Sequence, residues 1–157
     1  MRDKKEWSVM EKFPKFSLEN QNGEIVTNDD LTGTTVIYFY PKDNTPGCTT
    51  QACDLRDNIT AFNELGVTVY GVSKDSKESH QKFIEKQGLN FDLLVDEDHK
   101  LAKEAGIIGE KNVFGKLTVG LIRSTFVIDK DSNILKRFDK VSPKKHVEQV
   151  LEFLKEG

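Results

Sequence analysis

The chain has 157 residues and a formal net charge of −3, because 26 Asp and Glu residues outnumber 23 Lys and Arg residues. This length predicts a single domain over residues 1–157 with one hydrophobic core. The mild acidity argues against nucleic acid as a partner, since nucleic-acid-binding proteins usually carry a basic surplus. The longest apolar run, Val36–Tyr40, is far shorter than the ~20 residues that span a bilayer, so no membrane association is expected.

Short β-rich runs alternate with longer helical patterns along the chain. In chain order the pattern predicts strands over 13–18, 24–27 and 34–40, a helix over 46–65, a strand over 67–72, a helix over 76–87, a strand over 91–95, a helix over 98–105, strands over 118–122, 124–129 and 134–138, and a last helix that Ser142 caps and Pro143 begins. This order is typical of an α/β protein with the thioredoxin fold, in which helices flank a central mixed β-sheet. The first two strands predict an N-terminal hairpin extension.

The charged regions of the predicted helices contain all three histidines. His80, His99 and His146 are therefore expected on the surface. The first residues of the chain lack the apolar run of a signal peptide, which indicates a cytoplasmic protein.

The two cysteines, Cys48 and Cys53, are too few for a disulfide scaffold, and they lie only five residues apart. With no histidine near them in the sequence, no metal site is expected. If both share one α-helix, their Cα atoms are ~8.7 Å apart. A disulfide normally requires less than ~7 Å, so the pair can bond only if the first turns of the helix unwind.

Cys48 falls in the first turn of its predicted helix, where Thr45 is the N-cap and Pro46 the first residue. Free backbone N–H groups and the positive end of the helix dipole favour a thiolate at this place. Arg123 lies between two apolar runs, where an unpaired cation is costly, so it should face a partner. A thiolate and the leaving oxygen of a substrate would both serve.

The segment around Cys48 resembles the active-site motif of the peroxiredoxins. The motif is Pro41-x-x-x-Thr45-x-x-Cys48, and the longer string YFYPKDNTPGCTTQAC is similar to the Q-type branch, the bacterioferritin comigratory protein group. The stretch 123–129 resembles the second signature of that family, and the resemblance extends from Phe13-Pro14-x-Phe16 over nearly the whole chain.

The resemblance implies a thiol peroxidase of the thioredoxin fold that uses no metal, haem or flavin cofactor. Cys48 would be the peroxidatic cysteine, whose thiolate attacks the O–O bond of hydrogen peroxide or an organic hydroperoxide and becomes a sulfenic acid. Thr45 would hydrogen-bond the peroxide, and Arg123 would hold the thiolate and polarise the O–O bond. Pro41 would shield the thiolate from water, and the N–H groups of Gly47 and Cys48 would stabilise charge.

The resemblance also assigns a role to Cys53. It would be the resolving cysteine, which forms an intramolecular disulfide with Cys48 that thioredoxin or a similar dithiol reduces. Members of this branch that resemble the chain are often monomers, and a weak dimer is also compatible with the sequence. Two alternatives stay open from the residues: a dithiol oxidoreductase or isomerase, although Cys-x-x-Cys is absent, and a redox sensor or chaperone-like binding module.

Overall fold

The computed structural model describes residues 12–113, 116–139 and 141–156. Its centre is a five-stranded sheet of order β5-β4-β3-β8-β9. The strands are β3 (Thr35–Phe39), β4 (Thr68–Ser73), β5 (Asp92–Val95), β8 (Ser124–Ile128) and β9 (Ile134–Phe138). Strands β3, β4 and β5 are parallel, whereas β8 runs antiparallel to both β3 and β9. The sheet is therefore mixed, as the sequence predicts for a thioredoxin fold.

Alternate residues of β3 and Tyr40, which directly follows it, supply the cores on the two faces of the sheet, because successive strand side chains point to opposite sides. Tyr38 and Tyr40 belong to one core, and Ile37 and Phe39 belong to the other. All four are buried, which is why the strand has no polar face.

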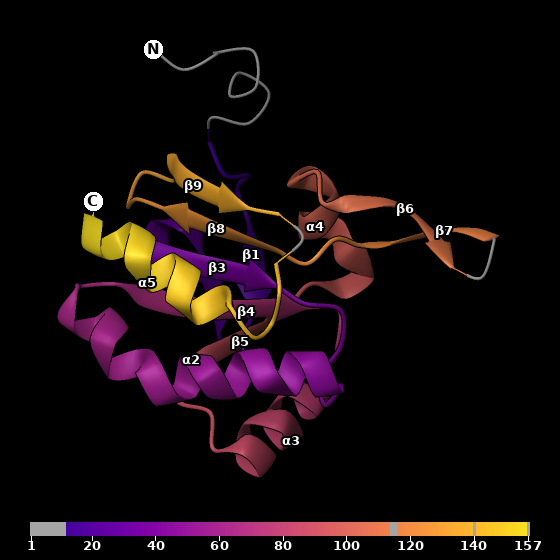
Figure 1. Cartoon of the computed structure of the whole chain (residues 1–157), viewed down its shortest axis with the longest axis horizontal. Coiled ribbons are helices and arrows are strands. Elements are labelled where there is room, and N and C mark those ends of the chain that lie inside the picture. The colour runs from indigo at the N-terminus through magenta and orange to yellow at the C-terminus, as the bar shows by residue number, and fades with distance from the viewer. Residues whose placement is uncertain (1–11, 114–115, 140, 157) are drawn as a thin grey trace.

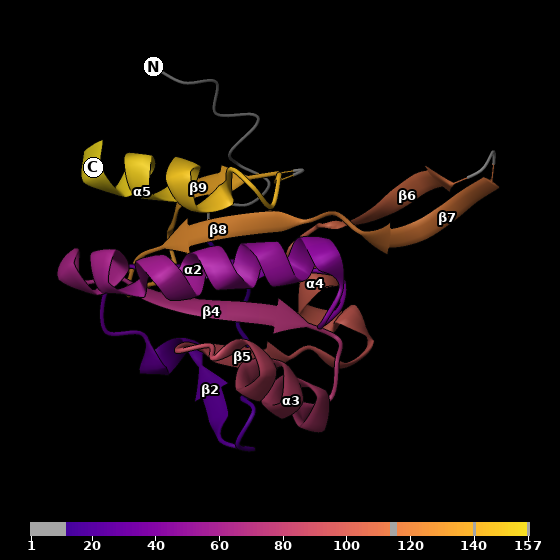
Figure 2. The same cartoon turned by 60° about the horizontal axis from the view of Figure 1, so that its bottom comes forward.

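Of the helices in the described residues, three pack on the tyrosine face of the sheet and one packs on the opposite face. The first three are α2 (Pro46–Glu64), α3 (Lys77–Gln87) and α5 (His146–Glu156), and the fourth is α4 (Lys100–Glu104), which follows the 3-10 turn η2 (Glu97–His99). Figures 1 and 2 show α2 and α5 side by side along this face, with α3 on the far side of α2 from α5. The helix over 46–65 is confirmed, and Gly66 follows its end with a φ of 74°.

The predicted N-terminal hairpin is present. Strands β1 (Ser17–Glu19) and β2 (Ile25–Thr27) pair antiparallel, and the 3-10 turn η1 (Asn28–Asp30) follows them. Val26 of this hairpin belongs to the same core as Phe39. The hairpin thus helps α4 to cover the second face of the sheet.

Two elements differ from the sequence prediction. The strand expected over 118–122 is part of a second hairpin, β6 (Ile108–Val113) with β7 (Lys116–Leu121), which projects from the body of the molecule (Figures 1 and 2). The last helix begins at His146 rather than at Pro143, because residues 143–145 form a turn in which Lys145 N–H donates to Ser142 O at 3.1 Å.

Two of the three histidines were predicted wrongly. His80 and His146 are fully buried, and only His99 is partly exposed. Each buried ring has hydrogen-bond partners that are distant in the sequence: Asp43 and Leu94 for His80, and Thr125 for His146. Among the described residues, no helix combines the length and apolar character needed to cross a membrane.

Candidate active site

Cys48 lies at the third position of α2, next to the end of the buried strand β3. Pro46 begins the helix, and the first helical hydrogen bond at this end joins Thr49 N–H to Thr45 O at 2.8 Å. The N–H groups of Gly47 and Cys48 therefore have no acceptor within the helix. The cysteine side chain is 1% exposed, so its sulfur lies in a site from which bulk water is largely excluded.

Arg123 brings the nearest cation to that sulfur. It lies in the short link between β7 and β8, and its Nη2 donates to Cys48 Sγ at 3.4 Å. Its Nη1 donates to the Oε1 atom of Gln51 at 2.6 Å. Gln51 is fully buried one turn after Cys48. An amide holds the guanidinium without neutralising it, so the positive charge of Arg123 remains available to an anion at Cys48.

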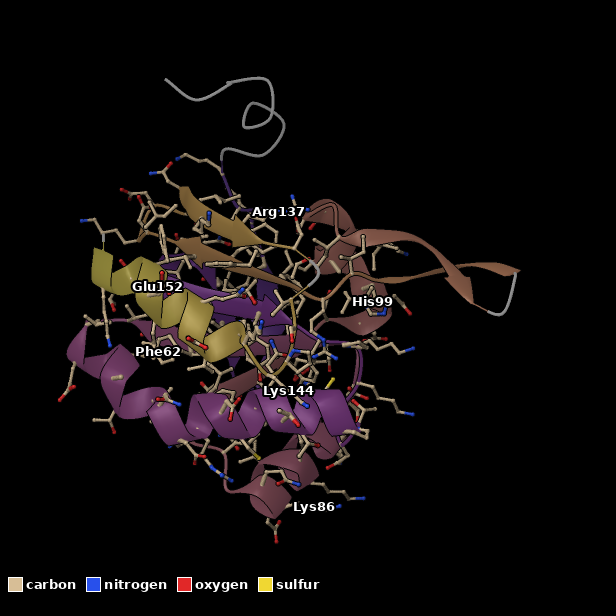
Figure 3. The ribbon with its side chains drawn as sticks, viewed as in Figure 1. Phe62, Lys86, His99, Arg137, Lys144 and Glu152 are labelled. Carbon is tan, nitrogen blue, oxygen red and sulfur yellow. The ribbon has the colours of Figure 1, made fainter. Side chains whose placement is uncertain are left out.

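Gly47 lies beside both Arg123 and Pro143. A Cβ atom at this position would lie 3.4 Å from Arg123 Nη2 and 3.4 Å from Pro143 Cγ. Pro143 belongs to the turn that leads into α5, in which Figure 3 labels Lys144. The first turn of α2 is thus enclosed by the arginine on one side and by the segment before α5 on another.

Thr45 and Pro41 lie in the loop that joins β3 to α2. Thr45 is the N-cap residue by position, but its side chain makes no capping bond to α2. Its hydroxyl instead donates to Lys42 O at 2.9 Å, which leaves the oxygen lone pairs free to accept a bond. Pro41 is half-buried and lines an open cleft of about 750 Å³ together with Lys74 and Lys103.

Cys53 is on the same helix as Cys48 but has a different neighbour. Both cysteines are free thiols, and α2 is continuous through both. The Cys53 thiol is half-buried and donates to Gln87 Oε1 at 3.5 Å, at the carboxyl end of α3. Next to it, Arg56 donates to the backbone carbonyl of Gln87 and pairs with Asp57 at 2.9 Å. The structure therefore shows the reduced state with the helix intact.

Two ionisable side chains close enough to be influenced by the charge of Arg123 are His146 and Tyr38. Burial, together with the charge of Arg123, lowers the pKa of His146 to about 3, so this ring is uncharged at neutral pH. Its Nε2 lies 2.7 Å from the hydroxyl oxygen of Thr125. Burial, and to a smaller degree Cys48, raises the pKa of Tyr38 well above 10. Neither side chain competes with Cys48 for the positive charge.

The sequence did not predict roles for Gln51, Asp43 and His80. Gln51 holds Arg123, and Asp43 pairs with His80 next to the loop before α2. The sequence carries a weak signal for Gln51, because it lies three residues after Cys48 on the same face of the helix. It carries no local signal for the Asp43–His80 pair, whose members are 37 residues apart. No group of three or more His, Cys, Asp or Glu side chains able to hold a metal occurs in the part of the chain that the structure describes.

Residues 9–137 match the model of the AhpC/TSA family. The chain belongs to this family. Among curated members, it is 48% identical over 149 residues to the peroxiredoxin Bcp of Bacillus subtilis, which covers 94% of this chain and 95% of that protein. It is also 48% identical to the peroxiredoxin Bcp of Escherichia coli, over 91% of this chain and 92% of that one. The peroxiredoxin family that the active-site motif resembles is thus confirmed.

Solved structures agree with this assignment. The bacterioferritin comigratory protein of Xanthomonas campestris, described by its alkyl peroxide reduction activity, superposes with a TM-score of 0.85 at 37% identity, covering 90% of each chain. BcpB of Mycobacterium tuberculosis superposes with a TM-score of 0.80 at 31% identity, over 92% of this chain and 94% of that one. The chain is accordingly a thioredoxin-fold peroxiredoxin, an oxidoreductase that acts as a thiol peroxidase.

Proposed function

We propose that this peroxiredoxin reduces hydrogen peroxide and organic hydroperoxides through Cys48 and is recycled by thioredoxin or a similar dithiol protein. The observation that carries the proposal is the 3.4 Å contact between Arg123 Nη2 and Cys48 Sγ at the start of α2. A thiolate at this position receives the guanidinium charge, two free backbone N–H groups and the helix dipole together. These features favour both the thiolate and the oxygen anion that leaves during the reaction.

In the first step, the thiolate sulfur of Cys48 attacks the distal oxygen of the peroxide, and the O–O bond breaks. The sulfur is oxidised to a sulfenic acid, and the leaving oxygen takes the bonding electrons and then a proton, which gives water or an alcohol. Arg123 stabilises charge on the leaving oxygen. Thr45 accepts a hydrogen bond from the peroxide O–H, since its own proton is already donated to Lys42 O.

Pro41 and Gly47 complete the proposed site. The ring of Pro41 is half-buried in the loop before α2, and we assign it the role of limiting water access to the thiolate and the sulfenic acid. Gly47, the second residue of α2, contributes its backbone N–H group.

In the second step, Cys53 attacks the sulfenic sulfur of Cys48, which forms a disulfide and releases water. Within an intact helix the two Cα atoms are ~8.7 Å apart, further than the ~7 Å limit for a disulfide. The first turns of α2 therefore unwind before the bond forms. Helix ends open at low cost, and the disulfide then becomes accessible to the reductant.

Two variants and one assay test the proposal. Cys48→Ser is expected to abolish peroxide consumption, whereas Cys53→Ser should consume one equivalent and then stop in the presence of thioredoxin. Thiol titration before and after stoichiometric peroxide, with mass spectrometry, should show two thiols lost into one Cys48–Cys53 bridge. Turnover by Cys48→Ser would refute the role of that residue. Insulin reduction in the absence of peroxide would instead indicate a dithiol oxidoreductase.

We further propose that residues 1–157 form one domain that works in the cytoplasm as a monomer, with a weak dimer as the alternative. The shared sheet and its two cores support the single domain. Two free thiols on one helix suit a reducing compartment. Analytical ultracentrifugation at several concentrations tests the oligomeric state.

A further inference from the structure

The side chain of Asp43 attaches the loop between β3 and α2 to the neighbouring helix α3. This carboxylate is buried, with 1% of the side chain exposed. Its Oδ1 accepts a hydrogen bond from the hydroxyl of Tyr40 at 2.6 Å. Its Oδ2 accepts one from the hydroxyl of Ser79 at 2.9 Å and lies 2.7 Å from Nδ1 of His80. Both Ser79 and His80 belong to α3, so the loop is attached to a helix distant in sequence.

The proton count of this cluster follows from the second nitrogen of His80. The ring is fully buried, and its Nε2 lies 2.9 Å from the backbone oxygen of Leu94 in β5. A carbonyl oxygen only accepts, so Nε2 carries a proton. A further proton lies between Nδ1 and Asp43 Oδ2, because two bare acceptors 2.7 Å apart would repel. The pair therefore carries no net charge, which lowers the desolvation cost of burying it.

The loop that this pair fastens contains one residue with a left-handed backbone. Asn44 has a φ of 62°, a conformation that asparagine adopts more readily than most residues other than glycine. The Asp43 N–H donates to Asp75 Oδ2 at 2.8 Å, and the same oxygen accepts from Ser73 at 2.7 Å. Side-chain bonds from α3 and from Asp75, which follows β4, thus attach the loop to two other parts of the fold.

We propose that Asp43 and His80 are a positioning pair for the peroxide reaction. They hold the loop 41–45 against α3 and thereby keep Thr45 and the first turn of α2 in place around Cys48. This rests on the proposed function of Cys48. Neither residue touches the sulfur, and both act through the loop. We call the Asp43–His80 pair and its bond to the loop the tether. A displacement of about 1 Å in a reacting group can lower a rate ~100-fold, so the tether can influence the reaction without contacting the reacting atoms.

Two kinds of variant test the tether: some remove its hydrogen bond, and one keeps a hydrogen bond with donor and acceptor exchanged. Asp43→Ala and His80→Ala leave a buried partner without its bond. Asp43→Asn restores a tether of the same shape, since the Asn amide can donate to Nδ1 of a ring that still donates from Nε2. Ser79→Ala removes one bond to Asp43 but keeps the link to His80. Leu101→Ala, in the core on the other face of the sheet, serves as a control for lost stability.

Two rates are measured for each variant by stopped flow and mass spectrometry. The rate constant for one turnover with hydrogen peroxide should fall ~10- to 100-fold in both Ala variants. Labelling of Cys48 by iodoacetamide should rise, because an unfastened first turn exposes a sulfur that is otherwise 1% exposed. Asp43→Asn and Ser79→Ala should stay within about threefold of the wild type in both rates. Leu101→Ala should change neither rate while the protein stays folded.

A wild-type peroxide rate in the Ala variants, or an Asn variant as slow as the Ala variant, overturns the proposal. So does an equal loss in Leu101→Ala. If the Ala variants do not fold, proton–nitrogen correlation NMR of the wild type tests the pairing of Asp43 with His80. The Nε2 proton of His80 should be visible and slow to exchange, and its absence contradicts the pairing. Should the wild type not react with peroxide at all, the proposed function fails, and the labelling rates still decide whether the tether holds the turn.

Discussion

Acid is expected to destabilise the folded protein through His146. Burial and the charge of Arg123 lower the pKa of this ring from its ordinary value of 6.5 to about 3 in the folded state. The unfolded chain therefore binds the proton more readily than the folded one. Stability is fully present above pH 6.5 and falls as the pH drops from there toward 3. The loss approaches ~1.4 kcal/mol for each pH unit within that window.

The magnitude can be worked out for two convenient conditions. Between pH 7 and pH 4.5, the His146 contribution alone lowers the free energy of unfolding by about 2–3 kcal/mol. Other groups titrate over the same range, so the contribution has to be isolated by a variant. His146→Gln can keep a hydrogen bond to the hydroxyl of Thr125 but cannot take up a proton.

Urea unfolding followed by circular dichroism at both pH values measures the effect. The wild type should lose about 2–3 kcal/mol more than His146→Gln on going from pH 7 to pH 4.5. His99→Gln serves as a comparison, since His99 is only partly buried and its removal should change the pH dependence less. Equal losses in the wild type and in His146→Gln would refute a buried, uncharged ring at this position.

Three further outcomes follow from the same structure. Arg123→Met is expected to lower the peroxide rate constant of Cys48 about 100-fold or more, as does loss of a charge-stabilising donor in other enzymes, and an unchanged stopped-flow rate would contradict its role. Gly71→Ala should destabilise the fold by ~1–3 kcal/mol in urea unfolding, because the added Cβ would lie 2.8 Å from the Tyr38 hydroxyl. Gly33→Ala is the matched control with a contact no closer than 3.5 Å, and similar losses would show that the clash does not matter. Disulfide formation should lower the helical circular dichroism by ~1–2 turns of α2, and a constant signal would mean that the helix stays intact.

The strands and long helices could be predicted from the sequence because their signals are local. The apolar stretch of β3 and the Thr45-Pro46 start of α2 each carry their information within a few residues. The expected proximity of Arg123 to Cys48 rests on the cost of leaving a cation unpaired between apolar runs, and the two side chains are 3.4 Å apart in the structure.

What was missed depends on contacts between distant parts of the chain. His146 lies in a charged stretch, and its burial depends on two partners distant in the sequence: the hydroxyl of Thr125 and the ring of Tyr38, whose centroid is 5.7 Å away. The start of α5 was placed at Pro143 because Ser-Pro is a common helix beginning, yet this proline instead packs beside Gly47. The projecting β6–β7 hairpin has many polar residues, so its first strand gave no apolar pattern to detect.

The amide that holds Arg123 has a consequence for the oxidised enzyme. While Cys48 is a thiolate, the guanidinium and the sulfur cancel each other, and the site has no net charge. Oxidation to a sulfenic acid removes the negative member, and Gln51, which is neutral, cannot replace it. The half-buried arginine is then left as a lone cation, which is stabilised by water. In the proposed mechanism, the chemical step would therefore weaken the closed first turn of α2 at the moment when Cys53 requires it to open.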